Sequence, residues 1–328
     1  MKIIIPAAGQ GVRLRPHTHT IPKVMLPVAG RPIIGHILAD VAPLEPTEVR
    51  LVVGYHGDRV ERYAREAFPA LPLRIVWQNE RLGLGHAVLA ALDEGDHDGV
   101  LVVLGDTVFE VDYAAIVAHR DHVLGVRRVP DPERFGIVEL DASGERIVRL
   151  VEKPAEPPTD LALVGLYWVT DGEKLRVAIA GLVDAGVRTR GEYQLTDALQ
   201  AMIDGGERFV AFPIRDWFDC GKPETLLETN RQLLDRRGGT THGEWPRTTI
   251  VPPVYLDEGC VIENAVVGPH VSLARGATIR DAVVRDSIIA ENAVVEGLVL
   301  ERSIIGPDVR VRRRPAVLNL GNGSEIEW

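Results

Sequence analysis

The stretch PAAGQGVRLRPHTHTIPKVMLPV, residues 6–28, directly follows a short apolar run at 3–5 and cannot continue it as regular structure. Its prolines lack the backbone N–H that helices and sheets need. Gly9 and Gly11 let backbone N–H groups approach a ligand and allow a positive φ. Arg13 and Lys23 add positive charge in the same place. The composition favours a loop that wraps a phosphate, although glycines and basic residues alone would equally suit a solvated turn.

Outward from this loop, residues 1–237 alternate apolar runs with amphipathic stretches. The runs 3–5, 49–53, 73–77 and 100–104 are typical of strands buried on both faces. Helical spacing is found at 33–41, 60–67 and 86–92. This order predicts a doubly wound, mostly parallel α/β sheet of the Rossmann-like type. Ligands of such sheets gather at the carboxyl ends of the strands, so the residues just after each run are the candidates for chemistry.

Composition limits the class of protein. The chain has 328 residues, a formal net charge of −10 and no long basic run, which argues against nucleic acid or an anionic membrane as the main partner. Cys220 and Cys260 are too few for a disulfide framework and lack metal-ligand spacing. The N-terminus shows no signal-peptide pattern and no run is long enough to span a bilayer. We therefore expect a cytoplasmic protein.

The pattern changes after residue 237. Residues 238–250 are polar and glycine-rich, which predicts a linker. Within 251–328, aliphatic residues recur every five or six positions with small residues beside them, a spacing that fits neither a helix nor an ordinary strand. Stacked short coils fit it, with aliphatic side chains pointing inward. The aliphatic positions are Leu256, Ile262, Val267, Leu273, Ile279, Val284, Ile289, Val295, Leu300, Ile305 and Val311.

The N-terminal pattern AAGQGVRLRPHTHTIPKVMLPVAGRPII (7–34) resembles the signature of the sugar-1-phosphate nucleotidyltransferases. The pattern is neither the Walker loop nor the dinucleotide-binding fingerprint. The resemblance implies that Ala8, Gly9 and Gly11 contact the triphosphate of a nucleotide, and that Arg13 and Lys23 stabilise charge during its transfer. Ala8 and Val12 depart from the Gly and Thr that are usual in the thymidylyltransferases. The repeats of 251–328 resemble, in imperfect form, a hexapeptide-repeat left-handed β-helix.

A second stretch, WQNERLGLGHAV (77–88), places an amide at the end of an apolar run, before a glycine turn. A glutamine offers both a donor and an acceptor and can read the edge of a base, although many such residues are merely solvated. The resemblance implies that Gln78 and Gly83 recognise a pyrimidine. It leaves thymine and uracil both open, because GLGHAV is closer to the uridylyltransferases.

Two aspartates are candidate metal ligands. Asp106 follows the run 100–104, and Asp219 precedes a glycine turn in WFDCGKPETLLETN (217–230). Either could simply cap a turn or helix, but together they could hold one hard cation whose other ligands are nucleotide oxygens and water. The resemblance implies that this cation is Mg²⁺.

The resemblance also locates a sugar-binding half between residues 134 and 199. It implies that Lys153 holds the sugar phosphate, that Glu152 and, more weakly, Glu192 contact hydroxyl groups, and that the sugar lies against Gly136, Gly165 and Val164. Taken one by one, these residues could be a solvated ion pair or a helix cap.

The predicted reaction transfers a nucleoside monophosphate from dTTP or UTP to a sugar 1-phosphate, with glucose 1-phosphate favoured. Three alternatives stay open: a mannose-1-phosphate guanylyltransferase, a bifunctional enzyme whose β-helix transfers an acyl group with His270 as the base, and a non-catalytic subunit. We expect the β-helix to serve a structural purpose and the protein to be a homo-oligomer.

Overall fold

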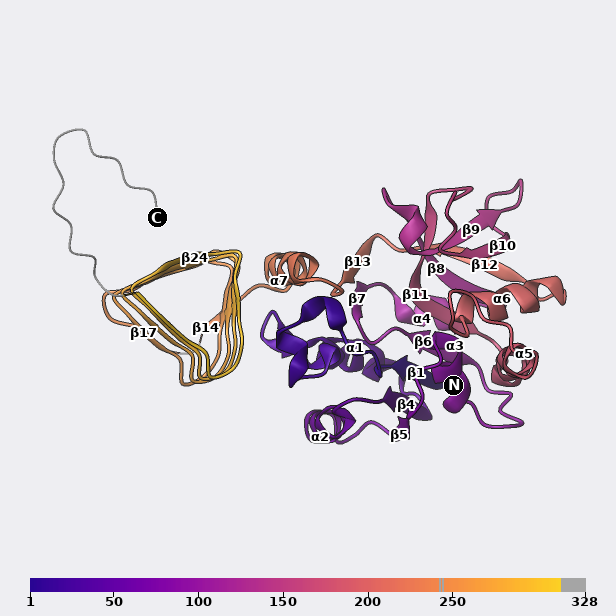
Figure 1. Cartoon of the computed structure of the whole chain (residues 1–328), viewed down its shortest axis with the longest axis horizontal. Coiled ribbons are helices and arrows are strands. Elements are labelled where there is room, and N and C mark those ends of the chain that lie inside the picture. Colours follow the sequence, from indigo (N-terminus) through magenta and orange to yellow (C-terminus); the bar gives the residue numbers. More distant parts are fainter. Residues whose placement is uncertain (242, 244, 314–328) are drawn as a thin grey trace. The chain divides into compact units, whose positions relative to one another are not determined.

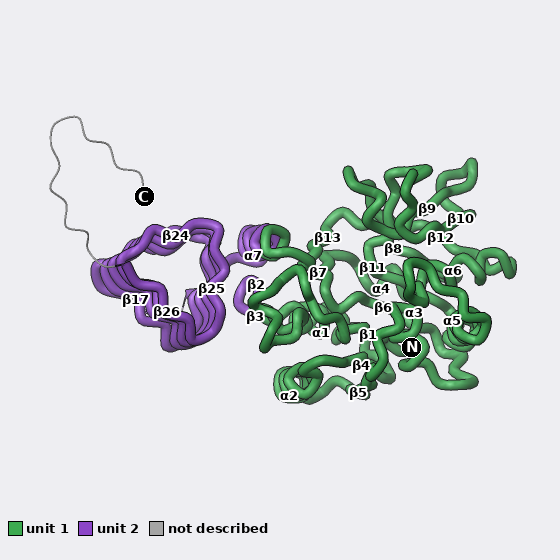
Figure 2. The backbone as a smooth tube through the Cα atoms, in the orientation of Figure 1, with its two compact units in different colours: residues 1–27, 31–226 green, residues 28–30, 227–328 purple. Residues whose placement is uncertain are grey.

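The computed structural model describes residues 1–241, 243 and 245–313, and its chain divides into two compact units. Residues 1–27 and 31–226 form the first unit, which we call the catalytic unit (Figure 2). The second, the β-helix unit, contains residues 28–30 and the described residues from 227 onward. The division between the units at 226/227 falls within helix α7 (Pro223–Arg237), whereas the expected boundary at residue 237 is the end of that helix. Residues 314–328 of the expected β-helix lie outside the described residues.

A nine-stranded mixed sheet forms the centre of the catalytic unit, which confirms the α/β fold class. Its order is β10-β9-β11-β6-β1-β4-β5, and β8 joins β11 to β12. The neighbours β6, β1, β4 and β5 run parallel, whereas β11 is antiparallel to β6, β8 and β9. The strands are β1 (Lys2–Pro6), β4 (Glu48–Val53), β5 (Leu73–Trp77), β6 (Val100–Val103), β8 (His122–Arg128), β9 (Gly136–Leu140), β10 (Ile147–Glu152), β11 (Leu161–Val169) and β12 (Phe209–Pro213).

Helices cover this sheet and bury its central strands. The side chains of β6 are fully buried, as the continuous apolar run predicts. The prediction was wrong for β5: Trp77 is 49% exposed, because β5 lies at the edge of the sheet and β4 is its one partner among the described strands. The helices are α1 (Ile33–Val41), α2 (Gly57–Ala67), α3 (Leu84–Ala90), α4 (Tyr113–Val117), α5 (Gly172–Asp184) and α6 (Leu195–Asp204). None of the described helices is long and apolar enough to cross a membrane.

The β-helix unit is a stack of short coils around an aliphatic core (Figure 1). Its strands form three parallel sheets, which appear as the three sides of a triangle in Figure 1. Ile262, Ile279 and Val295 stack in register and are almost completely buried, as their spacing predicts. The sheets contain β14 (Thr240–Thr241), β16 (Val254–Leu256), β19 (Val271–Leu273), β22 (Ile288–Ile289) and β25 (Ile304–Ile305); β15 (Thr249–Ile250), β18 (Val266–Val267), β21 (Val283–Arg285) and β24 (Val299–Glu301); and β17 (Val261–Glu263), β20 (Thr278–Arg280), β23 (Val294–Glu296) and β26 (Arg310–Arg312).

The segment 238–250 is more than the linker that its composition suggests. It contributes β14 and β15, which pair with β16 and β18 of the next coil. Polar residues suit these first strands because both are largely exposed.

Candidate active site

The signature loop leaves β1 and folds over Lys23. Gly11 has φ 62°, and its carbonyl accepts a hydrogen bond from Thr18 Oγ1 at 2.7 Å. A Cβ at Gly11 would lie 2.9 Å from the Cβ of Lys23, so this position requires glycine on both grounds. Gly9 differs, because a Cβ there would meet nothing within 4 Å and the backbone is open to an approaching ligand. The two departures from the signature also differ: Ala8 is buried, whereas Val12 is 54% exposed.

Lys23 and Asp106 form the first ion pair of the site. Lys23 Nζ lies 2.5 Å from Asp106 Oδ2; the lysine side chain is 7% exposed and the aspartate 39%. Burial alone would raise the pKa of Asp106, but the charge and hydrogen bond of Lys23, together with hydrogen bonds from its own backbone and Thr107, outweigh burial and lower that pKa below its usual value. Asp106 therefore has an ionised, partly exposed carboxylate, and the lysine paired with it is buried.

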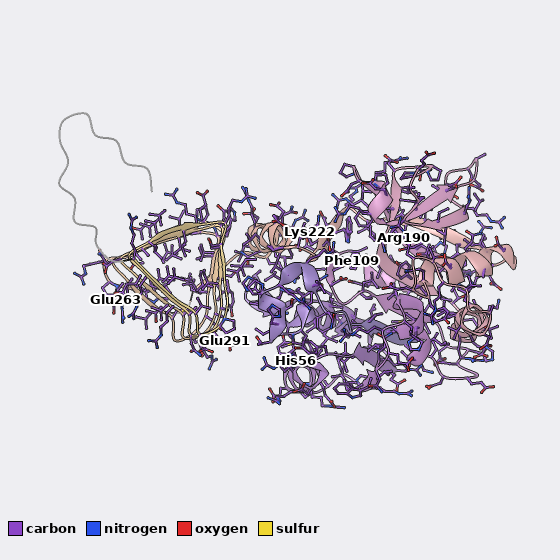
Figure 3. All side chains as sticks on the ribbon, viewed as in Figure 1. His56, Phe109, Arg190, Lys222, Glu263 and Glu291 are labelled. Carbon is purple, nitrogen blue, oxygen red and sulfur yellow. The ribbon has the colours of Figure 1, made fainter. Side chains whose placement is uncertain are left out.

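The second predicted metal ligand, Asp219, lies beside the first. Strand β13 (Asp216–Asp219) pairs antiparallel with β7 (Thr107–Glu110), which follows Asp106. Phe109 of β7, labelled in Figure 3, faces Trp217 in this ladder. Cys220 N–H donates to the Asp106 carbonyl at 3.1 Å, which closes the end of the ladder next to both carboxylates.

The pKa of Asp219 reflects its burial and the charged groups around it. Burial raises its pKa, and the negative charge of Asp106 raises it further, although Lys23 and Arg13 act in the opposite direction. A Cβ at Gly221 would lie 2.8 Å from Asp219 Oδ1 and 3.1 Å from Arg13 Nη2, so Gly221 leaves space for this pair. Arg13, Lys23, Asp106 and Asp219 thus gather where the sequence predicts a site for phosphate and metal.

Two adjacent carboxylates fit a hard divalent cation. Mg²⁺ keeps several waters and usually takes only one or two protein carboxylates together with substrate phosphates. No cluster of three or more acidic, histidine or cysteine ligands occurs among the described residues, so the remaining ligands would be substrate oxygens and water. The raised pKa of Asp219 is the sign of a negative charge that a cation would stabilise.

The glutamine at the end of β5 is held in one orientation. Gln78 is 9% exposed, and its Nε2 lies 3.3 Å from the Gly83 carbonyl and 3.2 Å from His86 Nδ1. A carbonyl can only accept a hydrogen bond, so Nε2 is the atom that faces Gly83 and His86 Nδ1 accepts the second N–H. The amide oxygen of Gln78 is left as the atom that can read a ligand. Gly83 itself, with φ 114°, has no room for a side chain against the Tyr193 carbonyl.

The second ion pair lies at the end of β10, between Glu152 and Lys153. Lys153 Nζ is 2.7 Å from Glu152 Oε1; here the glutamate is 7% exposed and the lysine 40%. Thr196 Oγ1 of α6 donates to the other glutamate oxygen, Oε2, at 2.7 Å. A Cβ at Gly136 would lie 3.1 Å from both Glu152 Oε2 and Thr196 Oγ1, so glycine allows these groups to meet. The exposed end of this pair is therefore the lysine.

The backbone of Lys153 is strained. Its φ of 42° is uncommon for a residue with a side chain, and such conformations cluster at functional sites. Its carbonyl accepts a hydrogen bond from Arg190 Nη2 at 2.7 Å (Arg190 is labelled in Figure 3).

Gly165, on β11, is a position that requires glycine. It has φ 92°, and a Cβ there would lie 2.5 Å from Leu104 Cδ1.

The two remaining predicted sugar contacts have different environments. Val164, on β11, is 2% exposed, and the contact of its side chain with a sugar stays a prediction. Glu192 is exposed, and its Oε2 accepts a hydrogen bond from Gln194 Nε2 at 3.3 Å.

Sequence reasoning missed Thr196, Gly221 and Arg190. Thr196 lies in the stretch GEYQLTDAL, where only Glu192 was identified, and its partner Glu152 is 44 residues away. Gly221 directly follows the Asp219 segment, and the signal that could have found it is the glycine turn itself. Arg190 acts through the backbone of Lys153, a contact that no motif spacing encodes.

The carboxylates Asp106 and Asp219, with cationic residues from a glycine loop beside them, have the charges that suit a divalent cation and phosphate groups. A model of the nucleotidyl transferase family matches residues 2–236. The chain belongs to this family and is an enzyme of the sugar nucleotidyltransferase class.

Several relatives resemble the chain along much of its length. A glucose-1-phosphate thymidylyltransferase of Streptomyces griseus is 32% identical over 306 residues, 86% of this chain and 84% of that protein. The UTP–glucose-1-phosphate uridylyltransferase AglF of Haloferax volcanii is 32% identical over 243 residues, 72% of this chain and 97% of the relative. The bifunctional protein GlmU of Methanocaldococcus jannaschii is 34% identical over 264 residues, but only 61% of its length is covered. A crystal structure of a UDP-glucose pyrophosphorylase complexed with UDP-glucose is similar with a TM-score of 0.61 and 25% identity, over 72% of this chain and 99% of that one.

Proposed function

We propose that the protein transfers a nucleoside monophosphate from dTTP or UTP to a sugar 1-phosphate, with glucose 1-phosphate as the favoured acceptor, and releases pyrophosphate. One observation carries this proposal: the adjacent carboxylates Asp106 and Asp219 lie with Lys23 and Arg13 at the carboxyl end of the sheet. Such a group binds phosphates through a shared cation and fixed positive charges.

The chemistry needs no general base. An oxygen of the sugar 1-phosphate attacks the α-phosphorus, the bond from that phosphorus to the bridging oxygen of the β-phosphate breaks, and pyrophosphate leaves. The attacking oxygen is already anionic, so the residues have to hold two mutually repelling anions in line. Arg13 and Lys23 would stabilise charge on the triphosphate, Lys23 from its buried position beside Asp106, and the exposed Lys153 would hold the sugar phosphate. When bound at Asp106 and Asp219, Mg²⁺ supplies charge neutralisation and a fixed geometry for phosphate oxygens.

The orientation of Gln78 supports uracil or thymine as the base. Both N–H groups of its amide are engaged by Gly83 and His86, so its oxygen can only accept. Uracil and thymine offer an N3–H donor to such an oxygen, whereas the corresponding nitrogens of cytosine and adenine are acceptors. Guanine also offers a ring N–H, and the exocyclic amino groups of cytosine and adenine are donors too, so the choice of uracil or thymine rests on the activities of the relatives as well as on Gln78, and a guanylyltransferase stays the alternative.

Glucose 1-phosphate as acceptor is supported by the activities for which relatives of the chain are named. Two of them, from S. griseus and H. volcanii, are named for reactions of that sugar phosphate. In this chain, Glu152 and Glu192 are the carboxylates that we assign to sugar hydroxyl groups, with Gly136 and Gly165 allowing close approach. Ala8, Gly9 and Gly11 are assigned to the triphosphate.

An acyltransferase activity of the β-helix has less support. His270 is 9% exposed, and its two ring nitrogens lie 2.8 Å from Asp235 Oδ1 and 3.2 Å from Asp286 Oδ1. A histidine held on both sides by carboxylates in the same unit is poorly placed to accept a proton from a substrate.

The test is a pyrophosphate-release assay that crosses dTTP, UTP, GTP, CTP and ATP with a panel of sugar 1-phosphates in the presence of Mg²⁺. We expect the highest turnover with dTTP or UTP and glucose 1-phosphate. A maximum with GTP would support the guanylyltransferase instead. Failure of every combination to release pyrophosphate would contradict the proposal and favour a non-catalytic subunit.

A further inference from the structure

A small hairpin follows the signature loop, and its tip belongs to the β-helix unit. Strands β2 (Pro27–Val28) and β3 (Arg31–Pro32) pair, and Ile33 N–H donates to the Leu26 carbonyl at 3.1 Å. At the tip, Ala29 and Gly30 have φ 45° and 81°, the positive values of a tight two-residue turn. Residues 28–30 are grouped by their contacts with the residues after 226, and Figure 2 colours them accordingly.

This hairpin is joined to Lys23 by a very short, hydrogen-bonded segment. Lys23 begins a 3₁₀ turn, Lys23–Met25, and its carbonyl accepts a hydrogen bond from Leu26 N–H at 3.1 Å. The same Leu26 closes the base of the hairpin through its own carbonyl. A displacement of the hairpin is therefore transmitted to the backbone that carries Lys23.

The amide of Asn230, on α7, holds the hairpin tip. Asn230 is 1% exposed, and its Oδ1 accepts hydrogen bonds from Ala29 N–H at 2.8 Å and from Ser272 Oγ at 2.7 Å. Its Nδ2 donates to the His270 carbonyl at 3.1 Å. The orientation of the amide is fixed, because a backbone N–H can only donate and a carbonyl can only accept. All of these contacts lie within the β-helix unit.

A second contact holds the tip independently. A Cβ at Gly30 would lie 2.3 Å from the ring of Tyr255, a residue of β16. The ring therefore packs against the bare Cα of Gly30, and any side chain at this position would force the two apart. The tip is thus held by a hydrogen bond at Ala29 and by close packing at Gly30.

We propose that Asn230 is a positioning residue for the transfer reaction, which holds the hairpin 27–32 and through it the backbone of Lys23. In this role Asn230, which is 1% exposed, acts through the backbone of residues 23–30 and not by contact with a substrate. The kinetic part of this inference rests on the proposed function, whereas the conformational part does not.

The test compares Asn230→Ala with Ser272→Ala in the full-length protein. Asn230→Ala removes the acceptor of Ala29 N–H, whereas Ser272→Ala removes a different hydrogen bond to the same amide oxygen and leaves the tip contact in place. By hydrogen exchange, we expect the amides of 23–33 to exchange ~10-fold faster or more in Asn230→Ala, and at the normal rate in Ser272→Ala. With Asn230→Ala, kcat should fall ~10-fold, because misplacing a catalytic group by about 1 Å is costly, while KM stays within about twofold.

Three outcomes would contradict the proposal. Normal exchange at 23–33 in Asn230→Ala means that the amide does not hold the hairpin. Faster exchange with an unchanged kcat means that the hairpin does not position Lys23, and an equal loss of kcat in Ser272→Ala indicates a general structural effect. If Asn230→Ala does not fold, Gly30→Ala releases the same tip from the other side, and the same two readouts apply. If the wild-type protein released no pyrophosphate, the proposed function would fail, and the exchange experiment would still decide whether Asn230 holds the loop.

Discussion

The two halves that we propose for the site, a phosphate half for the triphosphate and a sugar half for the sugar 1-phosphate, use a lysine–carboxylate pair in opposite ways. In the phosphate half, Lys23 is 7% exposed beneath an Asp106 that is 39% exposed. In the sugar half, Glu152 is 7% exposed and Lys153 is 40% exposed. The distances are similar, 2.5 Å and 2.7 Å, so burial rather than contact distinguishes the two pairs.

The difference shows which charge each pair offers to a substrate. The buried partner stays in its ion pair, because it has lost its hydration shell and only the opposite charge compensates for that loss. The exposed partner can exchange its contact for a ligand. The first pair therefore offers a carboxylate, which suits a metal ion, and the second offers an ammonium group, which suits a phosphate. Two lysines with similar partners are thus expected to act at different stages of one reaction.

Asp106→Asn should cause the largest loss. It removes the carboxylate that is kept ionised by Lys23, and we expect kcat to fall ~100-fold or more, as for other groups that stabilise transition-state charge. It also leaves the buried Lys23 ammonium without its counter-charge. We expect a loss of about 1–3 kcal/mol in unfolding free energy, less than for a fully buried pair because Asp106 is partly exposed. Pyrophosphate release and chemical denaturation measure the two effects; normal values of both would contradict the account of this pair.

Asp219→Asn should also lower kcat, with partial rescue by excess Mg²⁺, but its effect on stability should have the opposite sign. The folded-state pKa of Asp219 is raised, so its stabilising contribution is present at low pH and is lost as the pH rises through that pKa. Removing the charge should therefore raise Tm at pH 7. The gain should vanish when the pH falls below the ordinary pKa of an aspartate. A lower Tm at pH 7 in scanning calorimetry would show that the carboxylate is stabilised rather than strained.

Thr196→Val should have the smallest effect, confined to the sugar half. The variant keeps the shape of the side chain but removes its hydrogen bond to Glu152 Oε2. We expect KM for the sugar 1-phosphate to rise about three- to tenfold, in line with the loss of about one hydrogen bond to a charged group, while KM for the nucleotide is unchanged. Thr196→Ser keeps the hydroxyl and serves as the control. A change in the nucleotide KM instead would place Thr196 in the other half of the site.

The sequence was sufficient for the framework of the site. The strands before the signature loop and Asp106 are buried, and a continuous apolar run predicts such burial directly; the run before Gln78 was correctly predicted as a strand, although not as a buried one. The coil positions of the β-helix were found for the same reason, because stacked inward positions repeat along the chain. Asp219 could be matched to Asp106 only through the resemblance, since 113 residues separate them.

What the sequence could not provide was the surroundings of each group. Trp77 belongs to an apolar run, but its strand lies at the sheet edge, and no local pattern distinguishes an edge from a centre. Val164 was identified from its motif alone, and the sequence gives no sign that its side chain is as deeply buried as 2% exposure. The hydrogen bond from Ala29 N–H to Asn230 Oδ1 joins residues that are 201 positions apart. Its donor is a backbone group, so the spacing of side chains in the sequence does not predict it.

The most direct test of the central claim is a steady-state comparison of Lys23→Ala with Lys153→Ala, using the best pair of substrates. If the two pairs act as their burial indicates, Lys23→Ala lowers kcat and leaves KM for the sugar 1-phosphate within about twofold, because its charge is needed in the transition state. Lys153→Ala instead raises that KM ~10-fold or more, because its exposed ammonium holds the sugar phosphate in the ground state. The account would be contradicted if Lys23→Ala kept near-normal turnover, or if both variants changed the same kinetic parameter to the same extent.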